Sequence, residues 1–275
     1  MATLDLGDCA LDYDEVGRGR PLVLVHGGWL NREAWRPQVE HFADEYRVIT
    51  FDVRGHGRTG PTDARRYSID LFTDDLEYLL EHLEIERPIL GGLSLGSMVA
   101  QTYVARHPDE VAAAVLGGPV RSMVPLDLPA GAKSLFTPTP ALAGALALGG
   151  PESTFRSMLR SIRTTTGDPW LTTDPSVRAA AIESVRDVSS AEFRKVFDAL
   201  YRFDAPRLTD CTTPVLGVYG EYEAPMLKRQ THELIEPVRD GRWAVVPDAA
   251  HLVNQDAPAA FNELVGDFLA DVAGS

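Results

Sequence analysis

The sequence predicts an α/β protein built on a mostly parallel, doubly wound sheet with helices on both faces. Two observations favour this class: short continuous apolar runs recur along the chain, and amphipathic helical stretches lie between several of them. Continuous apolar strands are typical of a sheet covered on both faces, and strands that alternate with helices favour parallel pairing. The apolar runs are PLVLVHG (21–27), RVITFDV (47–53), PILGGLS (88–94), VAAAVLGG (111–118), PVLGVYG (214–220) and RWAVVPD (242–248).

The remaining elements follow from local patterns. Residues 4–16 alternate loosely between apolar and polar, which favours one or two antiparallel strands with turns. Residues 68–85 predict an amphipathic helix, because Ser68 suits the N-cap position and 5 leucines follow at helical spacings. The stretches 94–108 and 257–272 predict two further helices, the first ending before a proline and the second carrying a proline in its first turn.

Between residues 120 and 205 this alternation breaks down. The segment begins with a stretch rich in proline, glycine and alanine (124–150), continues with helical stretches that carry arginines, and returns to a strand only at 214–220. We interpret 120–205 as a helical cap, or lid, inserted in a core made of residues 1–119 and 206–275.

The composition of the chain limits the kinds of molecule that we expect it to bind. The 275-residue chain has 40 acidic residues against 26 Lys and Arg, a formal net charge of −14, which disfavours nucleic acid and anionic membranes as partners. No apolar run approaches the ~20 residues of a membrane span, and residues 1–15 lack the layout of a signal peptide. We therefore expect a cytoplasmic monomer or homodimer. Cys9 and Cys211 are too few for a disulfide framework or a metal site, and we expect no metal.

A serine between two glycines is the first candidate for chemistry. Residues Gly92 to Gly96 read G-x-S-x-G, with Ser94 at the centre, a predicted strand before it and a predicted helix after it. A sharp strand-to-helix turn of this kind exposes a nucleophilic hydroxyl, and the new helix directs free N–H groups at developing negative charge. The alternative is a Gly/Ser loop that merely starts a helix.

Two backbone N–H groups are candidates for an oxyanion hole. The N–H of Leu95 directly follows the serine, and Gly28 lies in the HGG turn after the strand at 21–27. Donors in these two places stabilise the oxyanion of a tetrahedral intermediate. The alternative for Gly28 is a tight turn in which the next residue, Trp29, serves only in packing.

His251 is the candidate general base. It lies in PDAAHLVNQDAP, between the last predicted strand and the last predicted helix. Imidazole takes up and releases protons near neutral pH, which suits a general base. The chain has 7 histidines, and a lone surface histidine is the usual alternative, but this one follows a strand at the edge where Ser94 emerges.

The order HGG, FDVRGHGRT, GLSLG, VYGEYE and PDAAH resembles the α/β-hydrolase fold family, in its serine-nucleophile branch of esterases and cofactor-free haloperoxidase-like enzymes. The resemblance extends from about Leu4 to Ala273. It implies an eight-stranded-type, mostly parallel sheet, a cap at 120–205, the chain order serine, acid, histidine, and no metal or organic cofactor. A serine nucleophile disfavours the haloalkane dehalogenase and epoxide hydrolase branches, which use a carboxylate.

The resemblance places the acid of the triad at Glu223, where many relatives carry aspartate. Glutamate orients a histidine equally well. Glu221 is one alternative. A second is an acid after the strand at 111–118, where the first one is Asp127.

These residues predict a serine hydrolase that cleaves a small, largely apolar carboxylic ester or lactone through an acyl-enzyme. Its partner is a small-molecule substrate. Three arginines at helical spacings, Arg156, Arg160 and Arg163, either receive a carboxylate or form a solvated helix face. Candidates for the substrate pocket, which are alternatively packing residues of the cap, are Trp29, Phe136, Phe155, Trp170 and Leu252.

Two classes of alternative stay open. The same three side chains serve C–C bond hydrolysis, thioester cleavage, cofactor-free peroxidation and natural-product cyclisation. A non-catalytic small-molecule-binding protein of this fold is the other class, although a pure binder has no need of an orienting acid. Fold alone does not decide between them.

Overall fold

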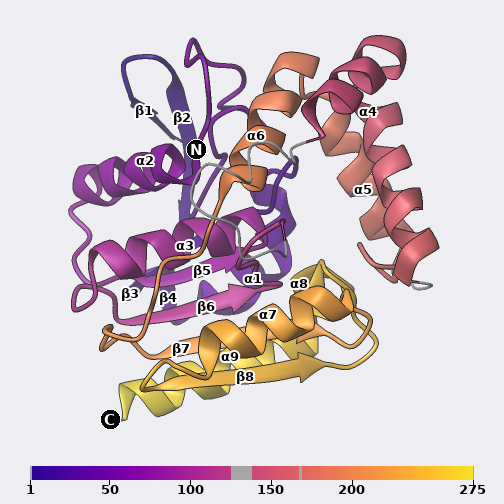
Figure 1. Cartoon of the computed structure of the whole chain (residues 1–275). Coiled ribbons are helices and arrows are strands. Elements are labelled where there is room, and N and C mark those ends of the chain that lie inside the picture. Colours follow the sequence, from indigo (N-terminus) through magenta and orange to yellow (C-terminus); the bar gives the residue numbers. More distant parts are fainter. Residues whose placement is uncertain (1, 125–137, 167–168, 275) are drawn as a thin grey trace.

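The computed structural model describes residues 2–124, 138–166 and 169–274 (Figure 1). Within them the strands form an 8-stranded sheet in the order β1-β2-β4-β3-β5-β6-β7-β8. The strands are β1 (Ala2–Asp5), β2 (Ala10–Val16), β3 (Arg20–Val25), β4 (Tyr46–Phe51), β5 (Ile89–Leu93), β6 (Ala113–Gly117), β7 (Val215–Gly220) and β8 (Gly241–Val246).

The sheet is parallel from β4 to β8, while β1 and β2 pair antiparallel at one edge. The chain runs from β3 outward to β4 and then crosses to the other side of β3 to form β5. The predicted fold class is therefore confirmed. The crossing leaves the carboxyl ends of β3 and β5 side by side, the place where open α/β sheets bind their ligands.

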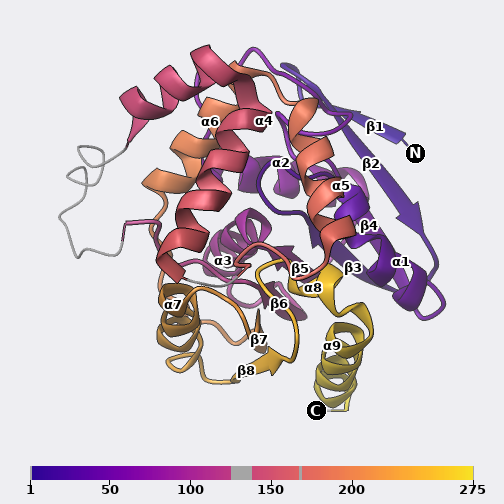
Figure 2. The same ribbon diagram turned by 90° about the vertical axis from the view of Figure 1, so that its right-hand side faces the viewer.

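Helices cover both faces of the sheet. On one face lie α2, α3 and α7, and on the other lie α1 and α9 (Figures 1 and 2). The core helices and short turns are α1 (Arg36–Phe42), α2 (Ile69–His82), α3 (Leu95–Arg106), α7 (Pro225–Ile235), α8 (Val253–Asp256), α9 (Pro258–Ala273) and the 3-10 turn η1 (Arg32–Trp35).

Three helices between β6 and β7 form a separate layer, which we call the cap helices: α4 (Thr139–Thr166), α5 (Pro175–Arg186) and α6 (Ser190–Arg202). Figure 2 looks onto the carboxyl ends of the parallel strands, and the cap helices lie across that edge. Helix α4 is kinked at Gly150, which has a φ of 69° and is followed by Pro151. The boundaries of the cap at residues 120 and 205 stay a prediction.

The structure departs from the predicted elements in two ways. Helices α1 and α7 were not apparent from the apolar pattern, and the helix α4 begins at Thr139, inside the stretch rich in proline, glycine and alanine. The strand β8 is not covered on both faces, since Trp243 and Val245 are 44% and 39% exposed. As the last strand of the sheet, β8 has a neighbour on one side only.

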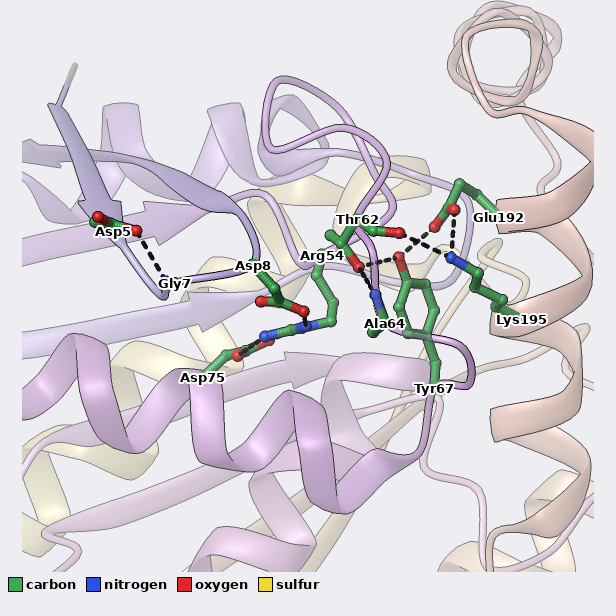
Figure 3. A network of polar contacts seen from close by, with 10 residues as sticks. All are labelled: Asp5, Gly7, Asp8, Arg54, Thr62, Ala64, Tyr67, Asp75, Glu192 and Lys195. Carbon is green, nitrogen blue, oxygen red and sulfur yellow. Dashed lines mark hydrogen bonds and ion pairs between the residues drawn. The ribbon is translucent and has the colours of Figure 1, made fainter.

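A buried polar network ties the core to the cap (Figure 3). The Tyr67 hydroxyl, in the loop before α2, donates to the Glu192 carboxylate of α6. Lys195 Nζ donates to the same carboxylate at 2.8 Å and to the Thr62 carbonyl at 3.0 Å. Burial and the Glu192 carboxylate raise the pKa of Tyr67, so its hydroxyl remains protonated and donates.

Figure 3 also shows that the start of this loop, at Arg54, is bound to the core. The Arg54 guanidinium donates to both Asp75 oxygens, at 2.7 and 2.6 Å, and to Asp8 at 2.7 Å. A bidentate guanidinium–carboxylate pair has a defined geometry as well as a favourable energy. The loop is therefore bound to the core at Arg54 and to the cap helix α6 at Thr62 and Tyr67.

We predict that Tyr67→Phe lowers the free energy of unfolding by about 1–3 kcal/mol, because the buried Glu192 carboxylate loses a donor. Chemical denaturation measures the change. Tyr78, whose side chain is 58% exposed, supplies the matched control, and Tyr78→Phe is expected to stay within about 0.5 kcal/mol of the wild type. Equal effects of the two substitutions would show that the network does not stabilise the fold.

Candidate active site

Ser94 joins β5 to α3 in a strained backbone conformation. Its φ and ψ are 54° and −108°, a combination that costs a non-glycine residue of order 1–3 kcal/mol. The surrounding backbone holds it there: the Ser94 N–H donates to the Gly117 carbonyl of the next strand at 2.9 Å, and the Ser94 carbonyl accepts from the Met98 N–H at 3.1 Å. The turn projects the serine side chain at the carboxyl edge of the sheet.

The flanking glycines are required by close backbone approach. A Cβ on Gly92 would lie 2.2 Å from the Gly96 carbonyl oxygen, and a Cβ on Gly96 would lie 2.0 Å from the carbonyl oxygen of Val25 in β3. Any larger residue would push α3 away from the sheet. The G-x-S-x-G spacing is thus explained by packing as well as by access to the serine.

The two predicted oxyanion donors belong to neighbouring residues. Gly28 lies in a turn closed by the Leu30 N–H and the Gly27 carbonyl at 3.2 Å. A Cβ built on Gly28 would lie 3.8 Å from the Leu95 Cβ. In the sequence, η1, α1, β4, α2 and β5 lie between these residues, and the adjacency of β3 and β5 in the sheet brings them together.

The histidine of the HGG turn has a structural environment. His26 is fully buried, its Nδ1–H donates to the Gly27 carbonyl at 2.8 Å, and its Nε2 accepts from the Val53 N–H at 3.0 Å. Burial lowers the pKa of His26 to about 4. His26 is therefore a neutral side chain that holds the turn, with both nitrogens engaged.

His251 and Glu223 form a buried pair at the same edge. His251 Nδ1 lies 2.6 Å from Glu223 Oε2, and the two residues are 4% and 2% exposed. Glu223 Oε1 accepts from the Ala224 N–H at 2.8 Å and from the Trp170 indole N–H at 2.9 Å. This arrangement fixes the imidazole and leaves its Nε2 side for another partner.

The alternative acids are placed differently. Glu221 Oε2 accepts from the Asp248 N–H at 3.1 Å, and Glu221 is exposed to solvent. Asp127 lies outside the described residues. Of the acids that the structure describes in the loop after β7, Glu223 is the one that contacts His251.

One cavity contains both Ser94 and His251, with a volume of about 380 Å³. Of the predicted pocket residues, Trp29, Phe155 and Trp170 line it. Phe136 lies outside the described residues. Leu252, the remaining candidate, is buried and is not part of the described lining, and its N–H donates to the Leu171 carbonyl at 2.9 Å.

Four methionines line this cavity, and three of them, Met98, Met123 and Met226, were not recognised from the sequence as pocket residues. The chain has 5 methionines, and all except the first residue are in the lining: Met98, Met123, Met158 and Met226. They come from four separate segments, so no spacing along the chain could have revealed them. Methionine is flexible and polarisable and adapts to irregular apolar ligands.

The three candidate arginines are not part of the described lining of this cavity. Arg156 pairs with Glu152 at 2.8 Å on the helix surface, and neither Arg160 nor Arg163 is part of the described lining. His251 is the ionisable base in that lining. The described part of the pocket therefore offers no permanent positive charge.

The described residues, 2–124, 138–166 and 169–274, contain no group of three or more His, Cys, Asp and Glu side chains placed to hold a metal ion. No helix within them combines the length and apolar character needed to cross a membrane.

Comparison with known proteins places the chain in a family. The family model for the alpha/beta hydrolase fold matches residues 20–258, and the chain belongs to this family. The chain is 26% identical to a putative non-heme chloroperoxidase of Synechocystis sp., over 94% of both proteins. It is also 26% identical to 3-oxoadipate enol-lactonase 2 of Acinetobacter baylyi, over 96% of this chain and 94% of that one.

Solved structures share the fold. A thermophilic esterase from Thermogutta terrifontis superimposes with a TM-score of 0.82 and 24% identity, covering 98% of this chain and 97% of the esterase.

We predict that Gly96→Ala lowers the free energy of unfolding by at least about 2 kcal/mol, because its Cβ overlaps the Val25 carbonyl. The matched control is Gly266→Ala in α9, where an added Cβ meets nothing within 4 Å. That change is expected to leave stability unchanged or to raise it by about 0.5–1 kcal/mol. Thermal and denaturant unfolding of the two variants test this, and a Gly96→Ala variant as stable as the control would contradict the packing argument.

Proposed function

We propose that this α/β-hydrolase is a serine hydrolase that cleaves a small, uncharged, largely apolar carboxylic ester or lactone through an acyl-enzyme on Ser94. The observation that carries the proposal is the joint placement of Ser94 and His251 in one apolar cavity, with His251 paired to the buried Glu223 carboxylate. A nucleophile, a base and an orienting acid are the parts that acyl transfer requires.

In the proposed mechanism His251 accepts the proton of the Ser94 hydroxyl as its oxygen attacks the substrate carbonyl. The N–H groups of Leu95 and Gly28 donate to the resulting oxyanion. Collapse of the tetrahedral intermediate transfers the proton from His251 to the leaving alcohol, and Glu223 stabilises the imidazolium in between. A water molecule, deprotonated by the same histidine, then releases the acid and restores Ser94.

The lining of the cavity supports an uncharged substrate. Apart from Ser94 and His251, its described residues are apolar or aromatic. A free carboxylate buried there would lose its hydration without gaining a cation, which is unfavourable. The enol-lactonase relative is named for a lactone of 3-oxoadipate. For the present chain we propose a lactone or ester without such a charged group.

Other chemistries of the fold use the same side chains and stay alternatives. The chloroperoxidase relative makes cofactor-free peroxidation one of them. C–C bond hydrolysis, thioester cleavage and cyclisation are others. A non-catalytic binding role is disfavoured, since a buried Glu223–His251 pair serves no purpose in an apolar binding site. A cytoplasmic location and a monomeric or homodimeric state stay predictions, as does the absence of cofactor, nucleic-acid and membrane partners.

We predict that Ser94→Ala and Glu223→Gln each lower the kcat for p-nitrophenyl esters by on the order of 10³-fold or more. The first removes the nucleophile, and the second removes the charge that stabilises the imidazolium. Glu221→Gln is the matched control, because Glu221 follows the same strand but contacts Asp248, and it is expected to retain near wild-type rates. A collapse in Glu221→Gln with activity in Glu223→Gln would overturn the assignment of the acid, and an active Ser94→Ala would overturn the hydrolase proposal.

A second prediction concerns substrate charge. With p-nitrophenyl valerate and the matched mono-p-nitrophenyl glutarate, which carries a terminal carboxylate, we expect kcat/KM to favour the neutral ester by about 100-fold or more. The comparison keeps chain length and leaving group constant. Equal values for the two esters would mean that the pocket receives a cation from elsewhere or leaves the chain end in water.

A further inference from the structure

The cap contributes one side chain directly to the Glu223–His251 pair. Trp170 precedes α5, and its indole N–H donates to Glu223 Oε1 at 2.9 Å. Its ring stacks on the His251 imidazole, with centroids 4.9 Å apart and an interplanar angle of 24°. One cap residue therefore contacts both members of the pair.

The backbone of the same segment is paired with the histidine loop. The His251 N–H donates to the Trp170 carbonyl at 3.0 Å, and the Leu252 N–H donates to the Leu171 carbonyl at 2.9 Å. These two bonds fix the position of the indole relative to the imidazole. Main-chain hydrogen bonds thus hold Trp170 in contact with His251.

Asp256 also links the segment that contains Trp170 to the loop that contains His251. Its Oδ2 accepts from the Thr173 N–H at 3.0 Å and from the Ala250 N–H at 2.8 Å, and its Oδ1 accepts from the Thr172 hydroxyl. One carboxylate therefore binds the cap segment and the histidine loop together. The docking of Trp170 does not depend on the indole alone.

The chemistry of Glu223 explains what the indole does. The Glu223 side chain is 0% exposed, and a buried carboxylate needs a hydrogen-bond donor on each oxygen. The Ala224 N–H and the Trp170 indole both reach Oε1, which leaves Oε2 to face His251. The indole donor therefore fixes which oxygen of the carboxylate the imidazole meets.

We propose that Trp170 is a positioning residue through which the docked cap completes the acid–histidine pair. This inference rests on the proposed serine-hydrolase function and adds a role for the cap beyond forming the wall of the pocket. If the cap moves away from the core, Glu223 loses a hydrogen-bond donor and His251 loses its stacking partner. The activity of Ser94 toward even the smallest ester then depends on a cap residue.

The test compares Trp170→Phe with Trp243→Phe, the same substitution at a half-exposed tryptophan of β8 that is not part of the described cavity lining. Trp170→Phe keeps a ring against His251 and removes the N–H. We expect its kcat to fall by about tenfold or more for p-nitrophenyl acetate and hexanoate alike, with little change in KM. Trp243→Phe should leave kcat and KM for both esters at wild-type values. If Trp170→Phe affects the hexanoate alone, the indole is only a wall of the pocket and the proposal fails.

A double-mutant cycle with Glu223→Gln adds a readout that a merely structural role would not move. If the indole acts through the Glu223 carboxylate, Trp170→Phe costs much less in the Glu223→Gln background than in the wild type. Equal costs in both backgrounds would overturn the proposal. Circular dichroism and thermal unfolding of each variant verify that it is folded.

Proton NMR of the wild type and Trp170→Phe separates this inference from the proposed function. The His251 Nδ1 proton, which lies between His251 and Glu223, should resonate far downfield and shift in Trp170→Phe but not in Trp243→Phe. If the wild type hydrolyses no ester while this resonance still shifts, the hydrolase proposal fails and the positioning role stands. A resonance that does not move contradicts the positioning role, whatever the activity.

Discussion

The backbone of Ser94 is the constraint on which the rest of the site depends. A φ of 54° places its side chain at the carboxyl edge of the sheet and starts α3 at once. Hydrogen bonds from the Ser94 N–H to the Gly117 carbonyl and from the Met98 N–H to the Ser94 carbonyl hold this conformation. The flanking residues Gly92 and Gly96 lie against carbonyl oxygens at distances that exclude a Cβ. Packing between β3, β5 and α3 thus maintains a local strain that serves the exposure of one hydroxyl.

The order of the strands brings the other groups to this serine. Gly28 follows β3, Glu223 follows β7 and His251 follows β8, and all three strands run parallel to β5. The carboxyl ends of parallel strands meet at one edge, so residues far apart in the chain converge there. The cap helices lie across the same edge, and side chains of α4 and α6 line the cavity. Trp170, between α4 and α5, donates to Glu223.

The sequence was most informative where a local pattern dictates local geometry. The G-x-S-x-G motif between an apolar run and a helix predicted both the turn at Ser94 and its position in the sheet. The choice between Glu223 and Glu221 could not be made in this way, because it depends on which carboxylate the loop after β7 turns toward His251. The contact of Trp170 with Glu223 was equally hidden, since it depends on how the cap docks on the core.

The central claim is that Ser94 is a nucleophile in an assembled site. Intact-protein mass spectrometry after incubation with a fluorophosphonate, followed by peptide mapping, tests it most directly. The account predicts a single adduct per chain, located on Ser94 and suppressed by a competing short-chain ester. No adduct, or an adduct on another residue, would contradict it and would favour a binding role for the cavity.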